Sequence, residues 1–455
     1  MKTFLPLLAA ATFLAATPDD PPAPTSALDD GAAVLREIAT PTPPPGVDLA
    51  LCLDTSGSMT GLIDAARAKL WAIVNDLALA TPTPRLRVAL LTFGNDTHDA
   101  EDGWVAVQTG FTEDLDLVSQ QLFALTTDGG TELVGRVLHA AEGRLDWSED
   151  EDSLRLVVVA GNESADQDQT ISFRDACRDL VSRDILVNSI YCGPLGDGID
   201  VGWREVATRA DGQFANIDQD HGTVVIETPF DLRLSELNTA LNGTYVPFGE
   251  RGRWASSNQI AQDSNALAMS PSVLSERTAT KAGKLYRCND WDLVDACEAG
   301  TVELVDLVAE DLPEELRGKT VEEQTEHLTA KKAERDEVST EIQALQTQRQ
   351  DFISAEMEKR AVDDGASFDR ALRDALRAQA GTKGLGFPDE HGQVRIVPPS
   401  EVPAVVAPPA GVVGPQAVMP QSRTAPAQVQ NRQVLNLAPA SNTQQLGTAP
   451  ATSNP

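Results

Sequence analysis

The chain has 455 residues, of which 41% are hydrophobic but only 5% aromatic, so it is long enough for two domains with a mostly aliphatic core. It carries 36 Lys and Arg residues against 69 Asp and Glu residues, a formal net charge of −33. A surface this negative repels nucleic acid and anionic lipid, so we exclude both as partners.

The beginning of the chain predicts export from the cytoplasm. Residues 1–16 combine one early Lys with an apolar run that ends in small residues and is too short to span a bilayer, which is the pattern of a secretory signal peptide. Residues 17–45 are rich in Pro and Ala and are expected to form a linker, with a short helix at 26–38. Because no later segment reaches transmembrane length, we expect a periplasmic or secreted protein.

Strand and helix patterns alternate over residues 46–228. Apolar or alternating runs predict strands at 47–53, 86–93, 104–109, 154–160, 185–191 and 213–217. Helical periodicity predicts helices at 61–79, 115–125, 133–145, 173–182 and 201–209. This order predicts an α/β fold with a doubly wound, mostly parallel sheet, in which ligands bind beyond the carboxyl ends of the strands.

The rest of the chain is predicted as a mixed extension at 229–310, a helical region at 311–393 and a disordered tail at 394–455. Within the helical region, helices are expected at 314–360 and 367–380. The first is strongly charged, with apolar residues near heptad spacing. Because Arg335 and Arg349 interrupt that seam, we expect this helix to fold back on its own domain rather than to form a dimeric coiled coil.

The five cysteines are an odd number for an oxidising compartment. Cys52 lies inside an apolar strand and is expected to be a buried thiol. For the other four cysteines we predict two disulfides between sequence neighbours, Cys177 with Cys192 and Cys288 with Cys297. Four cysteines allow three connectivities.

The chemistry of the chain is concentrated directly after the first strand. Asp54, Ser56 and Ser58 place a carboxylate and two hydroxyl groups at alternate positions on a loop that contains a glycine. Hard oxygen donors of this kind suit Mg²⁺, Mn²⁺ or Ca²⁺. The motif therefore predicts a divalent metal site at the carboxyl end of this strand.

At this point the sequence, over about residues 46–217, resembles the von Willebrand factor A (VWA) family of exported bacterial proteins. The family's metal-ion-dependent adhesion site (MIDAS) uses this motif together with a Thr and an Asp from two later loops. The resemblance implies that Thr131 and, in the position of the Asp, Asn162 complete the site. It also implies an open metal position that an Asp or Glu of a protein ligand fills.

Asn162 departs from the family pattern, because Asn supplies a neutral oxygen and the site loses one negative charge. Asp128, Glu163 or Asp166 could compensate for that charge. The alternative is a VWA fold whose site is degenerate and holds no metal.

Later segments are similar to an extension that follows the VWA domain in other exported bacterial proteins. They are Tyr245–Gly249, Ser275–Ala282 and Trp291–Ala296. We attach no activity to this resemblance and expect Trp291 to pack in a small satellite core.

The resulting prediction is a non-enzymatic, metal-dependent protein-binding module for adhesion or assembly. The histidines are scattered, no nucleophile motif is found, and neither a catalytic residue nor an organic cofactor is predicted. The alternative function is a metal-free structural scaffold that acts through its charged helical region.

Overall fold

A computed structural model describes residues 44–217, 226–359, 364–389 and 392–396, all within one compact unit. The predicted signal peptide, the short helix at 26–38 and residues 397–455 of the predicted tail lie outside the described residues.

The core of the fold is a six-stranded sheet with the order β3-β2-β1-β4-β5-β6. Its strands are β1 (Gly46–Asp54), β2 (Arg85–Phe93), β3 (Val105–Thr112), β4 (Leu154–Gly161), β5 (Ile185–Tyr191) and β6 (Phe214–Asn216). Neighbouring strands are parallel except for β2 and β3, which run antiparallel at one edge. The predicted mostly parallel α/β fold is confirmed.

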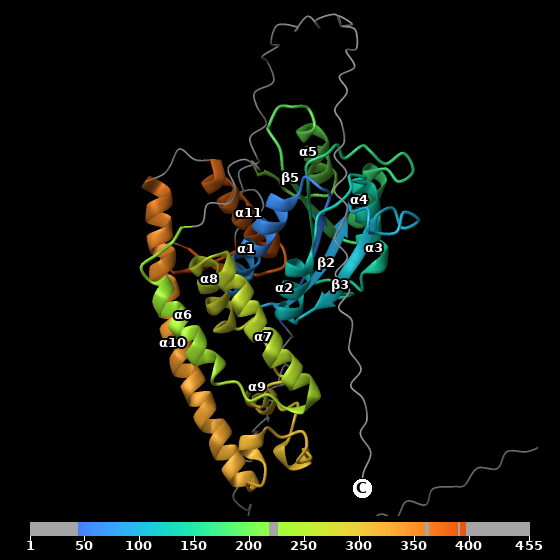
Figure 1. Ribbon diagram of the computed structural model, residues 1–455. Helices are drawn as coiled ribbons and strands as arrows, with labels where there is room; N and C mark the ends of the chain where they lie inside the picture. Colours follow the sequence, from blue (N-terminus) through green and yellow to red (C-terminus); the bar gives the residue numbers. More distant parts are fainter. Residues whose placement is uncertain (1–43, 218–225, 360–363, 390–391, 397–455) are drawn as a thin grey trace, which may run out of the picture. The chain divides into compact units, whose positions relative to one another are not determined.

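Helices cover both faces of the sheet (Figure 1). On one face lie α1 (Thr60–Ala78) and α2 (Leu115–Ala124), and on the other lie α3 (Val134–Arg144), α4 (Phe173–Val181) and α5 (Asp200–Arg209). Successive residues of β1 alternate between the two cores, which explains why this strand is apolar throughout.

The central strand β1 lies between β2 and β4, so the chain passes from one side of β1 to the other between these strands. In a doubly wound sheet this reversal opens a crevice at the carboxyl ends of the strands. The loops that follow Asp54 at the end of β1 and Gly161 at the end of β4 therefore meet at one place.

Residues 226–310 are mainly helical. They form α6 (Asp231–Asn242), α7 (Gly249–Met269), α8 (Pro271–Lys281), α9 (Leu293–Glu298) and a 3-10 turn (Leu304–Asp306). The Ser270 hydroxyl caps α8 by accepting the Val273 N–H at 3.1 Å. Trp291 stacks on Tyr245 with ring centroids 5.4 Å apart, in a small separate core as predicted.

The long charged helix is α10 (Val321–Lys359), which runs alongside α6 (Figure 1). It begins later than predicted, because Glu314–Leu316 form a 3-10 turn and a capping box at Thr320 and Glu323 starts the helix. The two arginines that interrupt the heptad seam both form ion pairs within this chain. Arg335 donates to Asp292 at 2.8 Å, and Arg349 donates to Asp231 at 2.9 Å.

The last helix, α11 (Asp364–Gly381), packs on α1 and on the sheet at β6. The side-chain amides of Gln379 and Asn188 exchange two hydrogen bonds, of 2.9 and 2.7 Å. Val394–Arg395 form β8, which pairs with β7 (Phe387–Pro388), so a short ladder includes the residues at which the tail was expected to begin. None of the described helices combines the length and the apolarity needed to cross a bilayer.

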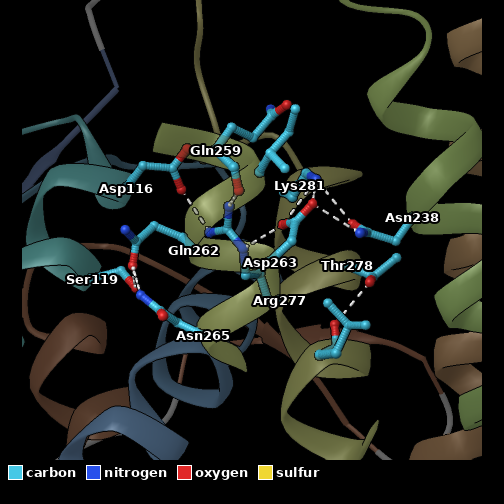
Figure 2. Close-up of polar contacts among 12 residues, drawn as sticks. Asp116, Ser119, Asn238, Gln259, Gln262, Asp263, Asn265, Arg277, Thr278 and Lys281 are labelled. Carbon is cyan, nitrogen blue, oxygen red and sulfur yellow. Dashed lines mark hydrogen bonds and ion pairs between the residues drawn. The ribbon is translucent and has the colours of Figure 1, made fainter. Parts of the chain in front are cut away.

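A buried polar cluster ties the later helices to the sheet domain (Figure 2). Arg277 on α8 donates to Asp116 on α2 at 2.6 Å and to Asp263 on α7 at 2.7 Å. Lys281, one turn further along α8, also binds Asp263, at 2.9 Å. The side chains of Arg277 and Lys281 are completely buried, so these pairings hold α2, α7 and α8 in one arrangement.

The predicted disulfides are wrong. Cys177 lies in the core that α4 covers, whereas Cys192 lies in the core on the opposite face of the sheet. Cys288 and Cys297 also pack in two different cores, and neither carries a disulfide. Cys52 is a buried thiol as predicted, and burial raises its pKa well above the usual range.

Candidate metal site

The loop after β1 presents three oxygen-bearing side chains. The Asp54 carboxylate accepts the Ser56 N–H through Oδ1 at 2.8 Å, which folds the loop into a tight turn. The Ser56 and Ser58 hydroxyl oxygens lie 3.3 Å apart. Asp54 and Ser56 are buried and Ser58 is exposed, so the three side chains extend from the interior to the surface.

Backbone hydrogen bonds fix the threonine loop beside this turn. The Gly57 N–H donates to the Gly129 carbonyl at 3.1 Å, and the Asp128 N–H donates to the Thr55 carbonyl at 3.1 Å. Thr131 itself forms an isolated antiparallel bridge with Gly94, the residue that follows β2. The second loop that the resemblance implied is therefore adjacent to the first.

The third loop comes from β4. The Asn162 side-chain nitrogen donates to the Ser58 hydroxyl at 3.0 Å. Its Oδ1 atom is buried and has no hydrogen-bond partner within the part of the chain that the structure describes. Half a rotation of this amide exchanges the two atoms and turns the oxygen towards the serines. Asn162 thus reaches the same spot as the first loop.

One acidic residue at this place was missed by the sequence analysis. Glu132 follows Thr131, is only 4% exposed, and lies within hydrogen-bonding reach of Asp54 and Ser56. The resemblance could have drawn attention to it only through its place after Thr131, since nothing in its local pattern indicates burial. It brings a second carboxyl group to the interior of the site.

The carboxyl groups of Asp54 and Glu132 lie close together, and each keeps one oxygen atom without a donor in the described structure. Asp54 Oδ2 and Glu132 Oε2 are both buried and lack a hydrogen-bond partner among the described residues. Burial raises the pKa of Asp54. Burial, followed by the negative charge of Asp54, raises the pKa of Glu132. Both shifts reflect two acidic groups that water does not solvate.

The three acidic residues considered as compensation in the sequence analysis occupy other positions. Asp128 is exposed and accepts the Gly129 N–H at 2.9 Å. Asp166 is paired with Arg174, at 2.5 and 3.0 Å. Glu163 is exposed at the rim of the site and acts on Asp54 through its charge.

Classical metal-binding side chains do not gather elsewhere in the described ranges. No group of three or more His, Cys, Asp and Glu residues there is placed to hold an ion. His98, which could have been suspected, is bonded to the Thr92 hydroxyl at 2.8 Å. The site at Asp54 differs from such a group, because most of the oxygen atoms that could bind a metal there belong to hydroxyl and amide groups.

The fold and this arrangement define the class of the domain. A six-stranded sheet with one antiparallel edge carries an Asp-Thr-Ser-Gly-Ser loop at the carboxyl end of its central strand, beside a threonine loop. This is the α/β fold of VWA domains.

Comparison with solved structures returns VWA domains. One is a von Willebrand factor type A protein from Catenulispora acidiphila, at 16% identity and a TM-score of 0.31, and the match covers 39% of this chain and 40% of that one. Proximal thread matrix protein 1 from the mussel byssus, with zinc in its MIDAS motif, matches at 16% identity and a TM-score of 0.29 over 39% of this chain and 43% of its own. The pilus adhesin SpaC from Lactobacillus rhamnosus GG matches at 12% identity and a TM-score of 0.31, over 39% and 28%.

The chain thus spans about two fifths of the length of the first two structures that it matches. No protein-family model matches the sequence, and no curated protein is significantly similar to it.

Proposed function

We propose that the protein is a non-enzymatic, divalent-metal-dependent protein-binding module that acts in adhesion or assembly outside the cytoplasm. Its location, periplasmic or secreted, rests on the apolar N-terminal segment, which lies outside the described residues.

The observation that carries this proposal is the set of unpaired oxygens at the switch point of the sheet. Asp54 Oδ2 and Asn162 Oδ1 are buried without a donor in the described structure, beside two serine hydroxyl groups 3.3 Å apart. A buried acceptor without a partner costs about 1–3 kcal/mol, and more when it is charged. A cation that binds these oxygens removes that cost.

The residues fit a hard divalent ion. Asp54, Ser56, Ser58, Thr131 and Asn162 would hold it through oxygen atoms, and hard oxygen ligands suit Mg²⁺, with Mn²⁺ or Ca²⁺ as the other candidates. When bound, the ion supplies an open position that attracts a carboxylate from an Asp or Glu of a protein partner. The exposure of Ser58 supports a position at the surface, where a partner can reach it.

Isothermal titration calorimetry of the mature chain tests the metal site. We expect saturable binding of Mg²⁺ and Mn²⁺ with a stoichiometry of about one, which Asp54→Ala abolishes. Asp64→Ala, which removes an exposed carboxylate on α1, is the matched control and should bind as the wild type does. If the wild type does not bind either ion at millimolar concentration, the metal-free scaffold becomes the better account.

A further inference from the structure

We propose that Glu132 is a ligand of the same metal ion and supplies the negative charge that the site loses at Asn162. This inference rests on the proposed function, and it assigns a role to a residue outside the five that the family pattern names.

The position of Glu132 supports direct contact with the ion. A Cβ atom built on Gly94 would lie 2.8 Å from Asp54 Oδ1, 3.0 Å from Glu132 Cγ and 3.5 Å from Ser56 Cβ. These three side chains therefore surround one point, next to the backbone of Gly94. Glu132 reaches that point from the threonine loop, on the side opposite to β4.

The burial of Glu132 also needs an explanation. Its side chain is enclosed, and its Oε2 atom lacks a donor among the residues that the structure describes. Asp54 Oδ2 is also buried without a donor in the described ranges, so the two side chains bring two unpartnered oxygen atoms to one place. A divalent ion bound to these oxygens supplies the partner that both lack.

The alternative is a structural role in which Glu132 carries a proton and donates a hydrogen bond to Asp54. The two roles differ in their dependence on charge. As a ligand, Glu132 loses its function when it is replaced by Gln, and a new carboxylate at position 162 restores that function. As a hydrogen-bond donor, Glu132 is replaced adequately by Gln, whose amide also donates.

Calorimetric titration of the mature chain with Mn²⁺ separates these roles. We expect Glu132→Gln to weaken binding at least tenfold, whereas Glu236→Gln, which removes an exposed acid on α6 outside the site, changes the affinity less than threefold. The double variant Glu132→Gln with Asn162→Asp should recover most of the lost affinity, because the number of negative charges returns to that of the wild type. Far-ultraviolet circular dichroism without metal verifies that each variant is folded.

Other outcomes contradict the inference in distinct ways. If Glu132→Gln is folded and binds Mn²⁺ as the wild type does, while Asp54→Ala does not bind, Glu132 is not a ligand and the metal site stands. If the double variant binds no better than Glu132→Gln, the two positions do not share one ion and the inference also fails. If the wild type itself does not bind, the proposed function fails first.

Discussion

Gly94 lies directly against the side chains of the candidate site. Its backbone φ of +81° lies in the left-handed region, and a Cβ atom there would lie 2.8 Å from Asp54 Oδ1. We expect Gly94→Ala to lower the free energy of unfolding by about 1–3 kcal/mol, from backbone strain and from the displaced carboxylate. Urea denaturation without metal measures this change.

Gly130→Ala is the matched control for that substitution. Gly130 belongs to the threonine loop, does not have a positive φ, and has open space where the Cβ atom would lie. Its replacement should alter the free energy of unfolding by less than about 0.5 kcal/mol. Equal destabilisation by both variants would mean that the crowding at Gly94 has no energetic effect.

Asn162 is the residue at which the site departs from the family pattern, and Asn162→Asp tests its place in the coordination sphere. The change adds a negative charge beside Ser58. We expect metal to bind about tenfold more tightly, which corresponds to about 1.4 kcal/mol. A carboxylate-bearing partner should then bind more weakly, because the charge of the cation is better neutralised. Calorimetry with metal, and then with partner, measures both effects, and an unchanged metal affinity would place Asn162 outside the site.

Asp54, Ser56 and Ser58 could be found from the sequence because one short loop carries them at fixed spacing after an apolar strand. Glu132 could not, because its burial depends on the bridge between Thr131 and Gly94. Of the acids that charge alone suggested, Asp166 is paired with Arg174, and Asp128 and Glu163 are exposed.

Buried charge contributes to the attachment of α7 and α8 to the sheet domain, beside the apolar contacts that Ala266, Val273 and Leu274 make in the core that α1 covers. Arg277→Met leaves Asp116 and Asp263 without their arginine partner in the interior, where Asp116 keeps the Tyr286 hydroxyl and Asp263 keeps Lys281. We expect the free energy of unfolding to fall by about 3 kcal/mol. Urea denaturation at neutral pH measures the loss.

Arg178→Met serves as the control at this scale. Arg178 forms an exposed pair with Asp175 on α4, and such pairs contribute about 0–1 kcal/mol. If Arg277→Met were no more destabilising than Arg178→Met, the cluster in Figure 2 would not hold the helices in place.

The same cluster explains why residues 229–310 were hard to interpret from the sequence. The inward face of α7 carries polar side chains, so the apolar stripe that marks an amphipathic helix is missing. The buried polar residues of α7 are Asn258, Gln259, Gln262 and Asp263, and its other buried residues are the small Gly252, Ala255 and Ala266. The strands and helices of the sheet domain were readable because their buried faces are aliphatic.

The cysteines show a related limit. Cys177 and Cys192 are close in sequence, yet the strand between them separates their side chains by the thickness of the sheet. Sequence spacing does not report which face of a sheet a side chain enters, so the predicted pairs could not be judged before the fold was known.

At the scale of the whole molecule, the sheet depends on a helix that lies far along the chain. Leu376, Leu385 and Phe387 are buried in the core that α1 covers. A chain that ends at residue 363 exposes this surface and loses roughly 1.5–3 kcal/mol for each large apolar side chain. We expect its thermal midpoint to fall sharply, with signs of aggregation. A chain that ends at residue 396 should melt like the full chain, and equal midpoints for all three would show that α11 does not stabilise the sheet.

The central claim is that the folded chain binds a divalent metal at Asp54. The thermal midpoint of the chain without residues 1–16, measured with and without millimolar Mg²⁺ or Mn²⁺, tests it most directly. A ligand that binds only the folded state stabilises it by about 2.7 kcal/mol at a hundredfold excess over its dissociation constant. We predict that metal raises the midpoint of the wild type and leaves the double variant Ser56→Ala, Ser58→Ala unchanged. An unchanged midpoint in the wild type would contradict the claim.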